Sequence, residues 1–322
     1  MRHIIGMLIR TFAYYCAIDE LFYFLNRRAK RVLVFHNVLP DDLFRPGVAN
    51  GVSMRLSEFS KVIDECAKHF GFTADVMDGK GATITFDDGF RNQYTTAFHL
   101  LRRRGIAACI FVTEHSMTKS RILVIDLLMH WVDNVPLDCI PGADRLRYWN
   151  EHVWPAFVKD AKCFGETILK ELDKRFPMDA VLAHLPDRYR EERLGPISEK
   201  ELGEMRMAGW RIGWHTRNHV VLSSLPESMI RNELDCPPQY RNECLSFPYG
   251  HMNLVGVDAI RLARIMGFPC AVSNVWGARE NASQYFLPRM ALPTSKIELH
   301  YVLSGFEYFL KHFRLLPKWR SG

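Results

Sequence analysis

The sequence predicts an α/β fold built on a parallel sheet or barrel, because short apolar strands alternate with amphipathic helices along most of the chain. The predicted strands lie at 31–35, 81–86, 106–113, 210–214, 245–247, 271–274 and 287–290. In such folds the functional residues collect at the carboxyl ends of the strands. A chain of 322 residues is long enough to bury the core of one large domain.

The predicted helices are amphipathic segments that follow the strands. The helix at 57–69 carries apolar residues along one side, and the helix at 94–104 ends at Gly105, which suits a helix C-cap. The helix at 198–208 begins with a capping box formed by Ser198 and Glu201. Further helices are predicted at 228–235, 257–266 and 297–313.

The segment at about 117–197 differs in character from the rest. It carries tryptophans, prolines and charged helical stretches such as 158–176, and it lacks a clear strand. We interpret it as a helical insertion or lid within one domain that spans 31–310. Residues 1–30 form a separate N-terminal helical segment, and 311–322 form a basic tail.

The composition is that of a globular protein, with 48% hydrophobic and 24% charged residues. The net charge of +6 is densest near both chain ends and indicates contact with anionic surfaces such as lipid head groups. No zinc-finger spacing or RNA-binding signature accompanies it, so nucleic-acid binding is not expected. The eight cysteines contain no C-x-x-C pair. They are interpreted as free thiols of a reducing, cytoplasmic compartment; Cys236 and Cys244 are close enough to bridge, but nothing requires it.

The first thirty residues leave two alternatives open. Their apolar run is interrupted by Arg10, so it is too short to span a membrane and fits a signal peptide poorly. An aromatic-rich helix at 7–25 is predicted instead, followed by the basic residues Arg27, Arg28, Lys30 and Arg31. This helix either packs on the domain or lies on an anionic membrane as an interfacial anchor. The expected location is cytoplasmic or peripheral at the cytoplasmic membrane face.

Two adjacent carboxylates, Asp87 and Asp88, end the apolar strand at 81–86 and are followed by Gly89. Like charges repel and are costly to bury, so their place at a strand end indicates a use. Successive strand residues point to opposite faces, but Gly89 permits a bend. One carboxylate could then hold a cation while the other moves protons.

His215 and His219 follow a later strand. If the residues after that strand are helical, the two imidazoles lie one turn apart on one face, at a spacing that suits one metal ion. Together with a carboxylate from the Asp-Asp pair, they would form a His-His-Asp site with open positions for water.

Three motifs in this order resemble the polysaccharide deacetylase family (NodB homology, carbohydrate esterase family 4). They are Thr-Phe-Asp-Asp-Gly at 85–89, His-Thr-x-x-His at 215–219 and Phe-Pro-Tyr-Gly at 247–250. The helix and strand at 100–113 resemble the family as well, and the resemblance spans roughly 31–305. It implies an irregular (β/α) barrel of about seven strands.

The resemblance also implies roles. Asp88, His215 and His219 would bind a divalent metal, most commonly Zn²⁺, although Co²⁺ or Ni²⁺ would also suit such ligands. Asp87 would be the general base, and the backbone N–H of Tyr249 would stabilise the oxyanion.

The chain departs from the commonest family pattern at two positions. The general acid usually comes from a late Leu-x-His, which His300 matches only superficially; His36 on the first strand instead resembles the permuted branch of poly-N-acetylglucosamine deacetylases and is preferred. Ser246 stands where the family often has the arginine that orients the base. Arg289, in a Leu-Pro-Arg-Met strand, is expected to pair with Asp87 in its place, the alternative being an arginine that bonds loop carbonyls.

The predicted function is a metal-dependent hydrolase that removes N-acetyl groups from amino sugars of a polysaccharide, glycolipid or lipid-linked precursor. The first alternative keeps the machinery and changes the acyl group, giving a deformylase or an O-acetyl esterase on a lipid-linked sugar. The second is an inactive glycan-binding relative, which the serine at 246 would allow.

Overall fold

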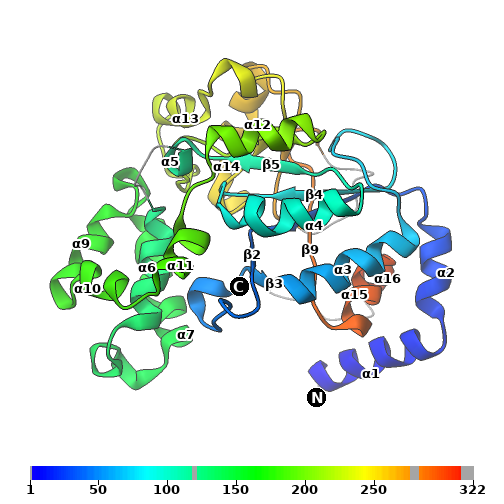
Figure 1. The fold of residues 1–322 in the computed structure, drawn as a ribbon, viewed down its shortest axis with the longest axis horizontal. Helices are drawn as coiled ribbons and strands as arrows, with labels where there is room; N and C mark the ends of the chain where they lie inside the picture. Colours follow the sequence, from blue (N-terminus) through cyan, green and yellow to red (C-terminus); the bar gives the residue numbers. More distant parts are fainter. Residues whose placement is uncertain (1, 118–121, 276–282, 313–322) are drawn as a thin grey trace.

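A computed structural model describes residues 2–117, 122–275 and 283–312. Its main sheet has seven strands in the order β8-β7-β6-β5-β4-β1-β9, and every paired neighbour is parallel (Figure 1). The strands are β1 Arg31–Phe35, β4 Ala82–Phe86, β5 Cys109–Val112, β6 Arg211–Trp214, β7 Leu245–Ser246, β8 Ala271–Val272 and β9 Met290–Ala291. The predicted irregular (β/α) barrel of about seven strands is confirmed. A small second sheet pairs β2 Asn37–Leu39 with β3 Ser53–Arg55.

The register of the sheet brings the functional strand ends together. Phe35 pairs with Phe86, so the residues that follow β1 and β4 leave the sheet side by side. Likewise Val112 pairs with Trp214, and the N–H of the next residue, His215, donates to the carbonyl of Val112 at 2.8 Å. The central strands are buried along their whole length because both faces are covered, as is usual for parallel strands.

The helices between the strands cover the sheet and bury their apolar sides against it. In the core, Phe59 of the first of these helices packs edge-on against Phe35. The capping box of Ser198 and Glu201 forms as predicted at the start of α12. The helices of this layer are α3 Leu56–His69, α4 His99–Arg103, α12 Glu199–Met207, α13 Glu227–Leu234 and α14 Met252–Ile265. A π-helical turn, Gln93–Phe98, precedes α4 within the predicted helix.

Between β5 and β6 the chain forms a separate group of helices (Figure 1, green). Trp131 and Phe157 lie at the centre of their apolar cluster, which also includes Phe90, Val221 and Leu254 from the barrel side. The principal helices are α6 Val124–Asn134, α7 Arg145–Tyr148, α8 Trp154–Lys159, α9 Glu166–Arg175, α10 Met178–Ala183 and α11 Asp187–Tyr189. The shared cluster packs this segment onto the barrel.

The N-terminal segment forms two helices where one was predicted at 7–25. These are α1 Arg2–Tyr15 and α2 Ile18–Leu25, and the chain turns between them at Ala17, whose φ of 55° is left-handed. The predicted C-terminal helix is likewise divided into α15 Lys296–Leu303 and α16 Phe306–His312, with Gly305 at φ +83° between them. Within the described residues, no helix is long and apolar enough to cross a membrane. Residues 313–322 of the predicted basic tail lie outside the described residues.

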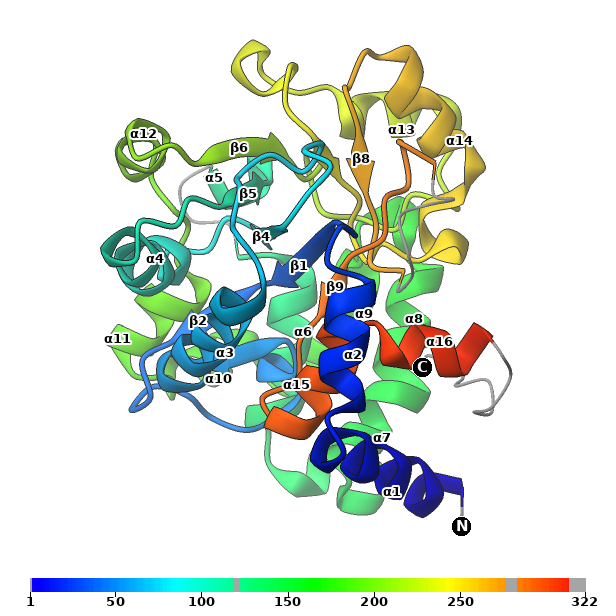
Figure 2. The same cartoon turned by 90° about the vertical axis from the view of Figure 1, so that its right-hand side faces the viewer.

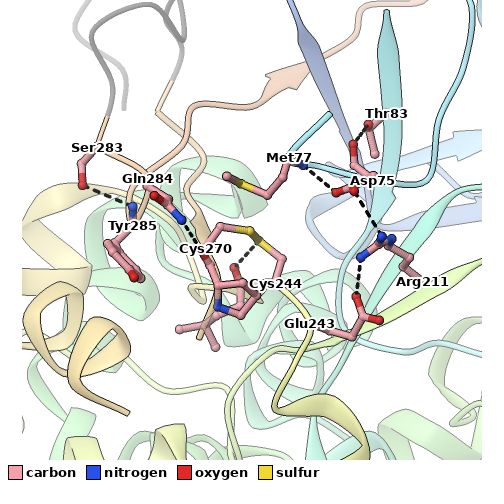
Figure 3. Close-up of a disulfide and its surroundings, with 12 residues drawn as sticks. Asp75, Met77, Thr83, Arg211, Glu243, Cys244, Cys270, Ser283, Gln284 and Tyr285 are labelled. Atoms are coloured by element: carbon pink, nitrogen blue, oxygen red, sulfur yellow. Dashed lines mark hydrogen bonds and ion pairs between the residues drawn. A yellow bond between two sulfur atoms is a disulfide. The ribbon is translucent and has the colours of Figure 1, made fainter. Parts of the chain in front are cut away.

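The prediction that all eight cysteines are free was wrong, because Cys244 and Cys270 form a disulfide (Figure 3). Each precedes a strand, β7 and β8, and these strands pair in parallel at Leu245 and Ala271, which places the two Cα atoms 4.9 Å apart. The two cysteines are 26 positions apart in the chain, so no local sequence pattern predicts this disulfide. Cys236, the other half of the bridge considered above, is a free and buried thiol. The cytoplasmic location stays a prediction that the cysteines no longer support.

Candidate active site

The Asp-Asp pair lies directly after β4 and is almost fully buried, with 1% of Asp87 and 6% of Asp88 exposed. The bend falls one residue earlier than expected: Asp88 itself adopts a left-handed φ of 76°, and Gly89 follows at the same value. Such a φ is uncommon for a residue with a side chain. The resulting turn separates the two carboxylates, so that each meets a different set of partners.

Asp88 faces two imidazoles. Its Oδ1 lies 3.4 Å from Nε2 of His215 and 3.2 Å from Nε2 of His219, and the three candidate ligand atoms lie within 4.8 Å of one another. The Nδ1 of His215 is 2.7 Å from the carbonyl oxygen of Ser246, which can only accept. Nδ1 therefore carries the proton, and the lone pair of Nε2 points toward Asp88.

The three residues fit a divalent metal ion. Oδ1 of Asp88 and Nδ1 of His219 are buried without a hydrogen-bond partner among the described residues. A buried carboxylate oxygen in that state is unusual unless an ion or water completes it. Two imidazole nitrogens and one carboxylate oxygen match the ligands of catalytic zinc sites, which leave at least one position open.

The two histidines converge through a loop, so the helical i, i+4 arrangement considered for them does not form. No helix includes 215–222; instead, Thr216 and His219 take left-handed φ values of 65° and 54°. The hydroxyl of Thr216 accepts a hydrogen bond from the N–H of His219 at 3.2 Å and holds this loop closed. The two imidazoles, four residues apart, are therefore brought together by a loop and not by a helix.

Asp87 is held by Arg289, which lies just before β9. Nη1 of the guanidinium donates to Oδ1 at 2.8 Å and Nη2 donates to Oδ2 at 2.5 Å, and both side chains are fully buried. Burial alone would raise the pKa of Asp87, but the charges of Arg289 and His215 and the hydrogen bonds from Arg289 together outweigh burial and lower the pKa. Ser246 also contributes: its hydroxyl donates to Oδ1 of Asp87 at 3.2 Å and accepts from Nη2 of Arg289 at 3.0 Å.

His36 follows β1 and lies across from this pair, with Nε2 3.9 Å from Oδ2 of Asp87 and 20% of its side chain exposed. Burial lowers its pKa, although Asp88 and Asp87 oppose this. His300 lies elsewhere: its Nδ1 is 2.7 Å from Oδ2 of Asp19 and its Nε2 is 2.9 Å from Oε1 of Glu65.

Tyr249 adopts a left-handed φ of 60° and its ring lies against His219, one of the candidate metal ligands. Its hydroxyl donates to the carbonyl of His219 at 3.2 Å, and burial raises the pKa of that hydroxyl. The ring meets Trp154 and Phe157 edge-on, with centroids 5.3 and 5.9 Å away. No spacing in the sequence links Trp154 to position 249, so this contact is visible only in the fold.

A fold and site of this kind define a carbohydrate-modifying hydrolase. The chain belongs to the polysaccharide deacetylase family (NodB homology, carbohydrate esterase family 4), whose sequence model matches residues 74–254. It is therefore a carbohydrate N-deacetylase. The matched segment contains Asp87, Asp88, both histidines and Tyr249, whereas His36 and Arg289 lie outside it.

Solved structures are similar to this chain at low sequence identity, and the first of them supports the fold. IcaB from Ammonifex degensii aligns with a TM-score of 0.50 and 16% identity over 83% of this chain and 92% of that one. The deacetylase PplD of Streptococcus pyogenes aligns with a TM-score of 0.49 and 12% identity over 83% and 93%. The deacetylase domain of BpsB from Bordetella bronchiseptica aligns at 0.40 and 16% over 82% and 96%. A search of curated proteins found no match.

Proposed function

We propose that this enzyme removes N-acetyl groups from amino sugars of a polysaccharide, a glycolipid or a lipid-linked precursor with the help of a divalent metal, Zn²⁺ before Co²⁺ or Ni²⁺. The main observation behind the proposal is that the two neighbouring carboxylates face different partners. Asp88 faces two imidazole nitrogens, and Asp87 faces a guanidinium. One carboxylate is thus placed to hold a cation while its neighbour stays free of it.

Asp88, His215 and His219 would hold the metal. When bound there, a divalent ion supplies Lewis acidity, which polarises an acetyl carbonyl and acidifies water. The hydrogen bond from Nδ1 of His215 to the carbonyl of Ser246 fixes the ring that would coordinate it. The chain's own residues supply the rest of the chemistry.

Asp87 is the proposed general base. Arg289 grips both of its oxygens and lowers its pKa, so the carboxylate is ionised at neutral pH and ready to take the proton of the attacking water. The backbone N–H of Tyr249 is proposed to stabilise the oxyanion, a contribution of roughly 3 kcal/mol for one donor. His36, partly exposed on the other side of Asp87, is proposed to give its proton to the departing sugar amine.

The test is acetate release from N-acetylglucosamine oligomers by the zinc-loaded enzyme. Asp87→Asn should lower turnover by about 100-fold or more, the range that general bases contribute, while one zinc per chain is retained. Asp88→Asn should lose the zinc as well. The exposed Asp138→Asn is the matched control and should change neither.

Full acetate release by the Asp87→Asn enzyme would contradict the assignment of the base. Formate release from N-formyl substrates at a higher rate than acetate release would replace the deacetylase by the deformylase alternative. Because Asp87→Asn leaves Arg289 without its partner, circular dichroism and zinc content must first show that this variant is folded.

A further inference from the structure

We propose that the outer face of α1 and α2 docks this enzyme on the surface of an anionic lipid bilayer. We define the outer face by its large exposed apolar side chains, which are Met7, Leu8, Phe12, Tyr15, Leu21, Phe24 and Leu25. Exposure is high for rings of this size, at 64% for Phe12 and 76% for Tyr15. Figure 1 shows the two helices at the edge of the molecule, and Figure 2, seen from that side, shows them in front with α15 and α16 beside them. This inference goes beyond the proposed chemistry and does not depend on it.

The spacing shows two amphipathic helices whose most apolar side faces away from the barrel. Leu8, Phe12 and Tyr15 recur at i, i+4 and i+7 on α1, and Leu21, Phe24 and Leu25 recur at i, i+3 and i+4 on α2. A helix of a globular protein normally turns such a stripe toward the core. A concentration of exposed apolar side chains marks an interaction surface.

The inner side of the same helices is firmly attached to the domain. His300 of α15 is held between Asp19 of α2 and Glu65 of α3, at 2.7 and 2.9 Å. The Tyr23 ring stacks on His69 with centroids 3.8 Å apart, and the side chain of Asn26 donates to the carbonyl of Ser304 at 2.8 Å. Because these contacts occupy the inner side, the outer face cannot turn inward to bury itself.

The positive charge next to the outer face favours an anionic bilayer as its binding partner. Arg27 and Arg28 follow α2 and are exposed, and the Arg27 guanidinium lies 4.2 Å from the centroid of the Phe24 ring. Aromatic and aliphatic side chains flanked by basic ones are the composition of helices that lie in the interface of anionic membranes.

A second copy of the chain fits this face less well. In a two-fold contact the same patch meets itself, so the positive charges of Arg27 and Arg28 would be brought twice into one interface. Glu20 is the exposed carboxylate that α2 offers against them. A membrane surface instead supplies a negative head group for each cation.

The experiment measures sedimentation of the full chain with vesicles made of equal parts phosphatidylcholine and phosphatidylglycerol. The apolar variant carries Leu8→Ser, Phe12→Ser, Leu21→Ser and Phe24→Ser, and should bind at least about tenfold more weakly. The charge variant, Arg27→Glu with Arg28→Glu, should lose about fivefold or more for each residue. The control carries Met207→Ser and Arg206→Glu, two exposed positions on α12, and should bind like the natural sequence.

Three results would overturn the proposal. The natural sequence could stay in the supernatant with anionic vesicles, the apolar variant could sediment as well as the control, or light scattering could show a dimer that only the apolar variant dissolves. Acetate release from soluble oligomers should be equal in all variants. A deacetylase that fails to bind vesicles therefore refutes the docking surface alone, and a vesicle-binding protein without activity refutes the proposed function alone.

Discussion

Replacing Arg289 by methionine tests how the site keeps its base charged and in place. The guanidinium makes two hydrogen bonds to Asp87 and further ones to Ser246, to the side chain of Asn274 at 2.6 Å and to the carbonyl of Ser273 at 3.0 Å. Arg289→Met would leave the Asp87 carboxylate buried without a counter-charge.

Two losses should follow from this change. Breaking a buried ion pair by removing one partner typically costs about 3–5 kcal/mol of unfolding free energy, which is roughly 100- to several-thousand-fold in the folding equilibrium. Without the arginine, burial dominates and the pKa of Asp87 rises instead of falling. The base is then partly protonated and no longer oriented, so kcat should fall by about 100-fold.

Urea unfolding and acetate release of zinc-loaded protein measure the two losses, and Asp87→Asn with Arg289→Met completes a double-mutant cycle. Because the double variant buries no unpaired charge, it should recover at least about 2 kcal/mol relative to the sum of the single variants, while activity stays lost. The matched control is Arg193→Met, which breaks the equally buried pair with Asp126 in the helical insertion, and it should lower stability without a comparable loss of kcat. Strictly additive effects of the two substitutions would refute the reasoning.

The remaining predictions concern three other histidines. Burial lowers the pKa of His130 to about 3, so below about pH 6.5 the unfolded chain binds a proton that the native one does not. The free energy of unfolding should therefore fall by about 2 kcal/mol between pH 7 and pH 5, and His130→Gln should reduce this slope in urea titrations; an unchanged slope would contradict it. His36→Gln should lower kcat by about 100-fold or more with little effect on stability. His300→Gln should instead lower the free energy of unfolding and leave kcat unchanged. The reverse pattern would identify His300 as the general acid.

Much of the site was predictable because its residues lie in short local motifs at strand ends. Asp87 and Asp88 end β4, and His215 follows β6, so the parallel alternation alone places them at one edge of the sheet. Arg289 was predicted to pair with Asp87 from a missing arginine at position 246, and the structure places the two side chains in contact. The first of these inferences needed only the order of the strands, whereas the pairing of Arg289 with Asp87 also needed the resemblance to the family.

The rest depended on distances that no local pattern encodes. The Cys244–Cys270 disulfide follows from the register of two strands joined by a helix. The loop that brings His219 to Asp88 follows from two left-handed residues that a helical spacing rule cannot anticipate. The contact of Trp154 with Tyr249 depends on how the helical insertion packs on the barrel.

The pairing of β1 with β9 has a consequence for the order in which the enzyme becomes active. The proposed metal ligands come from the middle of the chain, whereas His36 and Arg289 lie on or beside its first and last strands, which pair at Leu33 and Met290. A chain leaving the ribosome can thus complete its metal ligands while the base still lacks its arginine. With the proposed roles of His36 and Arg289, the complete set of catalytic side chains is assembled only when the two ends of the domain join.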